Sequence, residues 1–372
     1  MRKKYILPNL LIISVAFLML ALASCKKDKP QVTPVQTATP TQLGLYESDS
    51  SIFKLLIVAV SKVGTNSATD YPFVFDTGSG GMVIDADGIL PASMITSTGF
   101  NFTGDSTIVA GITITNQTST VEYGDDVTTA DKVYGNLAYA AVTVGDQNGS
   151  FVIKRLPFLI YYKAVDKNNK TYPTHEFDTF GVSEEYDITF PSGAYITSPF
   201  SYFDPGAGLT KGFKMAAIGT SNFALVPAYV PGVVTLGLTA ADLSSSSGFT
   251  MSQLTFYPGD GYAPIIPATL TYNNKSAFST NVLFDTGTEP YSYIEDPTAP
   301  NALTLLPSGV SVSVATNSGF NYSYVTSDSE NLTKTENPST SGTDVTILGL
   351  ESFLNNEYML DFTHHKLGLK KN

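Results

Sequence analysis

Two aspartates in this chain of 372 residues stand in nearly the same local sequence. Asp76 ends the stretch "FVFD" and Asp285 ends "VLFD", and each is followed by Thr-Gly and a hydroxyl residue. The accompanying residues are Thr77, Gly78 and Ser79 in the first copy and Thr286, Gly287 and Thr288 in the second. Two carboxyls held close together share one proton over a useful pH range, because both cannot easily carry a charge. Such a pair can activate a water molecule against an amide carbonyl and then protonate the leaving nitrogen.

The same kind of supersecondary unit precedes each aspartate. The runs "IFKLLIVAV" and "YPFVFDTGS" lead to Asp76, and "IPATLTYNNKSAFSTNVLFDTGT" repeats that arrangement of two runs and a turn before Asp285. A carboxylate at the end of a buried strand, with glycine two residues later permitting a tight turn, is presented on a rigid element. We therefore expect the two units to face each other about a pseudo-twofold axis, which would bring Asp76 and Asp285 together.

The chain after Tyr46 consists mostly of short β-branched and aromatic runs separated by Gly, Asn, Asp and Pro. This pattern predicts an all-β fold with few short helices. The best helical candidate is 350–360, and the polar segments 244–248 and 327–342 are expected to be exposed loops. The sequence shows no βαβ rhythm, no glycine-rich phosphate loop and no Cys/His metal spacing. We therefore expect neither a cofactor nor a metal ion.

In these motifs the chain resembles the pepsin-like aspartic peptidases, from about residue 50 to residue 370. The segment 121–145, "VEYGDDVTTADKVYGNLAYAAVTVG", is similar to the flap hairpin of that family. This segment contains Tyr123 and Gly124. Tyr123 comes 47 residues after Asp76, near the position expected for the flap tyrosine. The flap is therefore assigned to this segment.

Further segments carry the resemblance. "AAIG" (216–219) and "TILG" (346–349) resemble the two apolar-apolar-Gly elements that lie beside the aspartate strands. The segment 346–372 resembles the family's ending, which is a short helix, a strand with Asp-Phe and a final strand with Leu-Gly-Leu.

The resemblance implies a bilobal fold in which Asp76 and Asp285 form a catalytic dyad. It implies that the threonines exchange hydrogen bonds between the lobes, the glycines supply backbone N–H groups, and the following hydroxyl residues donate to the carboxylates. These residues are Thr77, Gly78, Ser79, Thr286, Gly287 and Thr288. Tyr123 and Gly124 would belong to a mobile hairpin that closes over an extended polypeptide substrate. Hydrogen bonds from the two hydroxyls would lower the pKa values of the dyad.

The chain also departs from the family pattern. It contains no tryptophan, and Val83 stands where many relatives have one that hydrogen-bonds the flap tyrosine. Asp125 and Asp126 replace the usual flap pair and would raise the pKa values of the dyad. The motifs of the first lobe are spaced more widely than those of the second, which predicts an insertion at 163–212 in the first lobe.

The N terminus predicts export and lipidation. Three basic residues precede an apolar run that ends in Leu-Ala-Ser-Cys, which resembles the lipobox of bacterial lipoproteins. We expect a signal peptide over 1–24, a lipidated Cys25 and a Pro- and Thr-rich tether over 25–45. The N-terminal lobe would then comprise 46–258 and the C-terminal lobe 259–372.

Charge and location restrict the partners. Removal of residues 1–24, with three positive charges and no negative ones, lowers the net charge from −12 to −15. Nucleic acid is not expected as a partner, because binding it requires a basic surface. A monomer is expected, since both aspartates lie in one chain. The lipid on Cys25 would hold the protein to a membrane of the bacterial cell envelope, at the periplasmic face or the cell surface.

Two functions fit these observations. The first is a lipid-anchored aspartic endopeptidase that hydrolyses peptide bonds with a water activated between two aspartates. The second is a catalytically inactive lipoprotein of the same fold that binds a protein or glycan. The two intact Asp-Thr-Gly sets favour the first function, and the altered flap favours the second. Paired Asp-Thr-Gly turns could also be Asx turns in an unrelated β protein.

Overall fold

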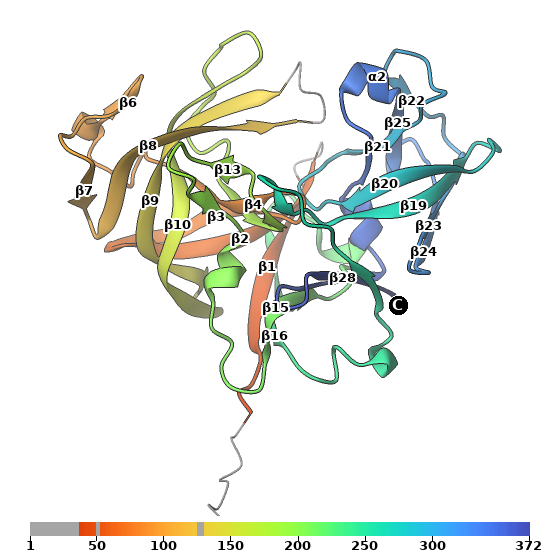
Figure 1. Cartoon of the computed structure of the whole chain (residues 1–372), viewed down its shortest axis with the longest axis horizontal. Helices are drawn as coiled ribbons and strands as arrows, with labels where there is room; N and C mark the ends of the chain where they lie inside the picture. Colours follow the sequence, from red (N-terminus) through yellow and green to blue (C-terminus); the bar gives the residue numbers. More distant parts are fainter. Residues whose placement is uncertain (1–36, 50–52, 125–129) are drawn as a thin grey trace, which may run out of the picture. The chain divides into compact units, whose positions relative to one another are not determined.

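The computed structural model describes residues 37–49, 53–124 and 130–372 (Figure 1). The predicted signal peptide 1–24, Cys25 and the pair Asp125-Asp126 lie outside these residues. No helix in the described residues is long and apolar enough to cross a membrane.

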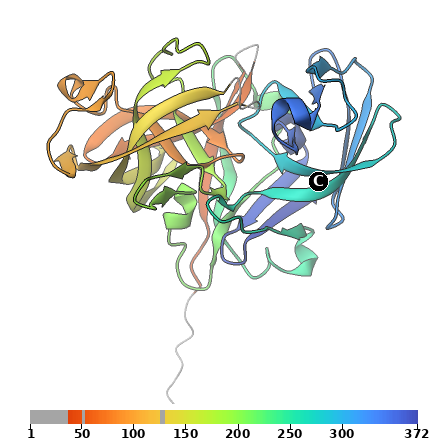
Figure 2. The ribbon, with the colours of Figure 1, turned by 45° about the horizontal axis from the view of Figure 1, so that its top comes forward.

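The described residues form two large sheets, of fourteen and eight strands. In spatial order, the first sheet contains β17 (Thr250–Gln253), β28 (Lys366–Lys371), β27 (Asn356–Asp361), β15 (Thr210–Met215), β16 (Ala228–Leu238), β1 (Thr41–Asp49), β2 (Lys54–Val63), β3 (Asn66–Asp76), β11 (Thr179–Val182), β4 (Gly80–Asp85), β10 (Gly149–Val165), β9 (Asp131–Asp146), β8 (Ile112–Tyr123) and β7 (Ser106–Val109). The second contains β22 (Thr304–Leu305), β25 (Leu332–Glu336), β21 (Tyr291–Glu295), β26 (Val345–Leu348), β20 (Phe278–Phe284), β19 (Ile265–Tyr272), β23 (Ser311–Thr316) and β24 (Asn321–Val325). Figure 2 shows the same two groups of strands from another direction.

Smaller elements complete the described fold. The two-stranded sheets are β5 (Ile95–Thr96) with β6 (Gly99–Phe100), β12 (Glu184–Glu185) with β18 (Gly261–Tyr262), and β13 (Ile188–Thr189) with β14 (Tyr195–Ile196). The short helical turns are η1 (Ala92–Met94), η2 (Pro199–Tyr202), η3 (Thr220–Asn222), η4 (Ser245–Ser247), α2 (Pro338–Ser341) and η5 (Leu350–Phe353). The prediction of an all-β fold with few short helices is confirmed.

The predicted repeat is present as two equivalent strand arrangements. In the first sheet, β2 and β3 form a hairpin, and β11 pairs parallel with β3. In the second sheet, β19 and β20 form a hairpin, and β26 pairs parallel with β20. Strand β11 also pairs antiparallel with β4, as β26 does with β21. Each aspartate therefore leaves a strand that is enclosed on both sides.

One motif assignment and the insertion tied to it were wrong. "TILG" (346–349) supplies β26 as predicted, but β11 (Thr179–Val182) takes the equivalent place in the first sheet. "AAIG" (216–219) instead follows β15, where the Ala216 amide bonds to Val233. The segment 163–212 is therefore not a simple insertion, because β11 in its middle is a central strand. The sequence obscured this because Thr179 replaces an apolar residue of the expected pattern.

The predicted tether over 25–45 was too long at its C-terminal end. Strand β1 begins at Thr41 and pairs with β2 and β16, and both Leu43 and Leu45 are fully buried. Burial of two leucines, worth about 1.5 to 3 kcal/mol each, favours the strand over an extended linker. The described folded body therefore includes residues 41–45.

Two local expectations near the C terminus also changed. The predicted loop 327–342 contains β25, which pairs parallel with β21 and buries Thr333 and Thr335, and the helical turn α2. The predicted helix over 350–360 is one turn, η5, followed by β27. Alternating threonines in "LTKTE" are typical of a strand, and that signal was masked by the polar flanks.

The last two strands of the chain belong to the first sheet. Strand β27 pairs with β15, and β28 pairs with β27 and β17. The division into lobes at residues 258 and 259 stays a prediction. The sheet pairing shows that β27 and β28, although they come after residue 259, belong to the first sheet.

The core under the first aspartate is aromatic: Phe73 and Phe75 of β3 are fully buried, and the Phe75 ring packs edge-on against Phe213 at 6.3 Å.

A buried carboxyl in β1 makes the stability of the fold depend on pH. Glu47 is fully buried, and this burial raises the pKa of its side chain to about 7. The folded state then binds a proton that the unfolded state releases, so stability falls as pH rises from about 4.5 to about 7. We expect Glu47→Gln to raise the free energy of unfolding by at most about 3 kcal/mol above pH 7 and to change it little near pH 4.

Denaturant unfolding at several pH values measures this effect. The exposed Glu176→Gln is the control for the loss of one charge. An unchanged pH dependence in Glu47→Gln would contradict the role of this carboxyl.

Candidate active site

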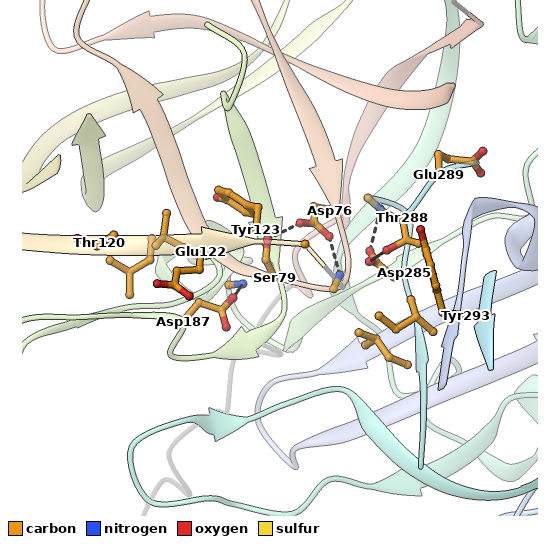
Figure 3. Close-up of a pocket in the computed structure, with 18 residues that line it drawn as sticks. Asp76, Ser79, Thr120, Glu122, Tyr123, Asp187, Asp285, Thr288, Glu289 and Tyr293 are labelled. Atoms are coloured by element: carbon orange, nitrogen blue, oxygen red, sulfur yellow. Dashed lines mark hydrogen bonds between the residues drawn. The ribbon is translucent and has the colours of Figure 1, made fainter. Parts of the chain in front are cut away.

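The two predicted aspartates meet at the centre of one cleft (Figure 3). Asp76 is the last residue of β3, and Asp285 follows β20 directly. A β-carbon added to Gly78 would lie 2.4 Å from the Asp285 carboxyl carbon, and one added to Gly287 would lie 2.8 Å from that of Asp76. Each glycine therefore permits the opposite carboxyl to approach, and a side chain at either position would separate the pair.

Two buried threonines connect the turns beneath the carboxyls. The Thr77 amide donates to Thr286 Oγ1, and the Thr286 amide donates to Thr77 Oγ1, each at 3.0 Å. Thr77 Oγ1 donates to the Phe284 carbonyl at 2.9 Å, and Thr286 Oγ1 donates to the Phe75 carbonyl at 2.7 Å. This reciprocal network fixes the two strand ends relative to each other.

Each carboxyl also receives the same two local hydrogen bonds. The Gly78 amide donates to Asp76 Oδ1 at 2.7 Å, and the Gly287 amide donates to Asp285 Oδ1 at 2.8 Å. The hydroxyls of Ser79 and Thr288 donate to the Oδ2 atoms of Asp76 and Asp285, respectively. The structure thus brings together all eight residues predicted at the dyad.

Proximity and burial hold a proton on this pair. Burial raises the pKa of Asp285 well above its ordinary value, and the charge and hydrogen bonding of Asp76 raise it further. The hydrogen bonds from Thr288 and Gly287 act in the opposite direction and are smaller. The sequence predicts that the two hydroxyls lower the pKa values of the dyad, but at Asp285 the effect of desolvation is larger than that of the Thr288 hydroxyl.

The predicted flap tyrosine lies at the same cleft. Tyr123 ends β8, which pairs with β9, and Gly124 follows it at a positive φ of 135°. The Tyr123 ring stacks on Phe177 at 5.8 Å, and its hydroxyl contacts the Thr179 side chain. Burial raises the pKa of Tyr123, so it is a neutral hydrogen-bonding group at any physiological pH. Phe177 and Thr179 hold the tyrosine in a chain that has no tryptophan.

The cleft around the dyad has a volume of about 600 Å³. It is lined by Asp76, Gly78, Ser79, Gly80, Thr120, Val121, Glu122, Tyr123, Gly124, Asp187, Ile188, Leu283, Asp285, Gly287, Thr288, Glu289, Tyr293 and Ile347. Asp187 and Glu122 lie on the side of the first sheet, and Glu289 and Tyr293 on the opposite side (Figure 3). Within the described residues, no group of three His, Cys, Asp or Glu side chains is placed to hold a metal ion.

Sequence reasoning missed two parts of the site. Gly181 of β11 packs so closely on the first turn that an added β-carbon would lie 2.6 Å from the Ser79 carbonyl oxygen. Asp187 enters the cleft from the loop after β12, and no nearby motif marks it. The unequal motif spacing could have located β11, since "TFG" at 179–181 gives a more even spacing than "AAIG" at 216–219.

Solved structures show what the described residues resemble. An aspartic proteinase from Irpex lacteus has a TM-score of 0.55 and 17% sequence identity, covering 90% of this chain and 98% of its own. The basic 7S globulin from soybean has a TM-score of 0.53 and 11% identity, covering 90% and 96%. No family model and no curated protein sequence matches the chain. The likeness shows the fold: the chain has the bilobal all-β fold of the pepsin-like aspartic proteinases.

Proposed function

We propose that this protein is an aspartic endopeptidase. The observation that carries the proposal is the dyad itself, in which Asp76 and Asp285 face each other above the reciprocal Thr77 and Thr286 hydrogen bonds. A fold kept only for binding does not require two opposed carboxyls with a full set of hydrogen-bond donors. The cleft would take a polypeptide substrate in extended conformation, with Tyr123 covering it.

In the proposed reaction, the dyad begins with one proton. The ionised carboxyl accepts a proton from the bound water while the water oxygen forms a bond to the carbon of the scissile amide. The other carboxyl donates its proton to the carbonyl oxygen, which gives a neutral tetrahedral intermediate. As this intermediate collapses and its C–N bond breaks, the protonated carboxyl gives its proton to the leaving nitrogen. The other carboxyl takes a proton from a hydroxyl of the intermediate, so the dyad again holds one proton. No covalent enzyme intermediate and no cofactor take part.

The test is cleavage of a diverse peptide mixture by the full chain, from strongly acidic to neutral pH. Mass spectrometry identifies the new ends, and pepstatin serves as an inhibitor directed at aspartic dyads. We expect internal cuts that pepstatin blocks. A folded protein that makes no cut at any pH would overturn the proposal and favour the binding module.

We further propose that lipid on Cys25 anchors this peptidase in the bacterial cell envelope. The support is the signal-like sequence before Cys25 and its place as the only cysteine of the chain. Mass spectrometry of the mature N-terminal peptide is expected to find Cys25 in first position with acyl chains attached. An unmodified cysteine in that peptide would contradict the anchor.

A further inference from the structure

We propose that Asp187 is a specificity-determining residue, which selects polypeptide substrates with a lysine or arginine side chain close to the scissile bond. This inference rests on the proposed function and names its substrate class. Asp187 lies in the loop between β12 and β13 and lines the cleft, with its side chain exposed to it. Figure 3 shows it on the first-sheet side of the dyad, below Ser79.

The Asp187 carboxyl is fixed in place by the backbone of the dyad turn. The Gly80 amide donates to its Oδ2 at 2.5 Å, and Gly80 follows directly after Ser79, whose hydroxyl bonds to Asp76. A side chain bound to Asp187 would therefore have a set position relative to the dyad. A β-carbon on Gly80 would lie 2.3 Å from the Glu185 carbonyl oxygen. The close packing of the Asp187 loop on the dyad turn therefore depends on glycine at position 80.

The surroundings of Asp187 fit a long side chain with a charged end. Val121 and Ile188, which follows Asp187 directly, both line the cleft and belong to one apolar cluster. Lysine and arginine bury an apolar stem and keep a cationic head for a polar partner. Two apolar residues together with the fixed Asp187 carboxylate, which the Glu185 side chain also contacts, therefore match a basic side chain better than a purely aliphatic or an acidic one.

The cleft itself offers no cation to this carboxylate. Its eighteen lining residues include five carboxyls and no Lys, Arg or His. Glu122 already has a partner, Lys132, whose Nζ lies 2.9 Å from Glu122 Oε1. Among the described residues, no ion pair of Asp187 with a basic side chain is formed.

The electrostatics of the loop support the same conclusion. Desolvation by the surrounding protein and the charge of Asp76 raise the pKa of Asp187 to about 7, and hydrogen bonds with the Gly80 amide and the Glu185 side chain lower it. The carboxyl is thus costly to ionise in the free protein. A bound cation would compensate this cost, and a hydrogen bond to a charged group is stronger than one between neutral groups.

Matched peptides test the proposal with the full chain. Each position around a mapped cut is filled in turn by lysine or by norleucine, which has a similar stem without the charge. We expect one position at which the lysine peptide has a kcat/KM at least about tenfold higher than the norleucine peptide. This is the effect expected from one hydrogen bond to a charged group. Asp187→Asn should remove that preference, so that the variant cleaves the lysine and norleucine peptides with similar kcat/KM. Asp87→Asn, an exposed aspartate that does not line the cleft, is the charge-matched control.

Binding to an inactive protein separates this inference from the proposed function. Titration calorimetry with Asp285→Asn is expected to show at least about tenfold tighter binding of the lysine peptide than of the norleucine peptide. Adding Asp187→Asn should equalise the two affinities. Equal cleavage or equal binding of both peptides by protein with Asp187 intact overturns the inference. Pepstatin-blocked cuts that persist in that case would leave the peptidase proposal standing.

Discussion

Asp76→Asn and Asp285→Asn are each expected to reduce peptide cleavage by at least about 10² to 10⁴-fold, the usual contribution of a general acid or base. Asparagine keeps the size of the side chain and can accept the bond from Gly78 or Gly287. It can neither take a proton from the water nor give one to the substrate. The loss should therefore appear in kcat, with the fold unchanged.

Initial rates on one mapped peptide, at its optimal pH, measure this loss. Asp87→Asn, which removes an exposed carboxyl outside the cleft, should retain full activity. Circular dichroism and thermal unfolding confirm that each variant is folded. Substantial cleavage by either dyad variant would show that the activity does not arise from these two aspartates.

The threonine network should dominate the stability of the site. Thr286→Val keeps the shape of the side chain but removes the hydroxyl, which leaves the Thr77 amide and the Phe75 carbonyl without their partner in a fully buried place. An unsatisfied buried polar group costs about 1 to 3 kcal/mol. We expect the free energy of unfolding to fall by roughly 2 to 6 kcal/mol, with a matching loss of activity.

Urea unfolding of Thr286→Val and of the exposed Thr189→Val gives this comparison. The exposed variant should change the free energy of unfolding by less than about 0.5 kcal/mol. A similarly small change in the free energy of unfolding of Thr286→Val would mean that the hydrogen bonds between Thr77 and Thr286 do not hold the two turns together. Activity lost without a loss of stability would instead assign Thr286 a role in positioning Asp285.

A raised pKa at Asp285 also bears on the pH range of the proposed activity. The dyad works while it holds one proton, and burial with the charge of Asp76 keeps that proton bound to higher pH than an isolated carboxyl would. The upper limit of activity is then set by release of this proton. The acidic pair Asp125-Asp126, expected to act in the same direction, lies outside the described residues.

The sequence by itself determined the class of fold and the residues of the dyad. Asp76 and Asp285 were identifiable because each ends an apolar run and precedes the same turn sequence, and such local signals do not depend on distant contacts. The same holds for Tyr123, whose strand and distance along the chain from Asp76 are local properties. The repeated pattern also predicted that the two aspartates would meet.

Only the tertiary structure decided which other segments join the site. Strand β11 is recognised by its pairing with β3 and β4, since Thr179 interrupts the apolar pattern on which sequence reasoning depends. Asp187 reaches the cleft because β12 pairs with β18, far along the chain, and because the Gly80 amide holds its carboxyl. Contacts between distant segments leave no periodic trace in a single sequence, and they decide both which side chains line the cleft and how strongly they bind protons.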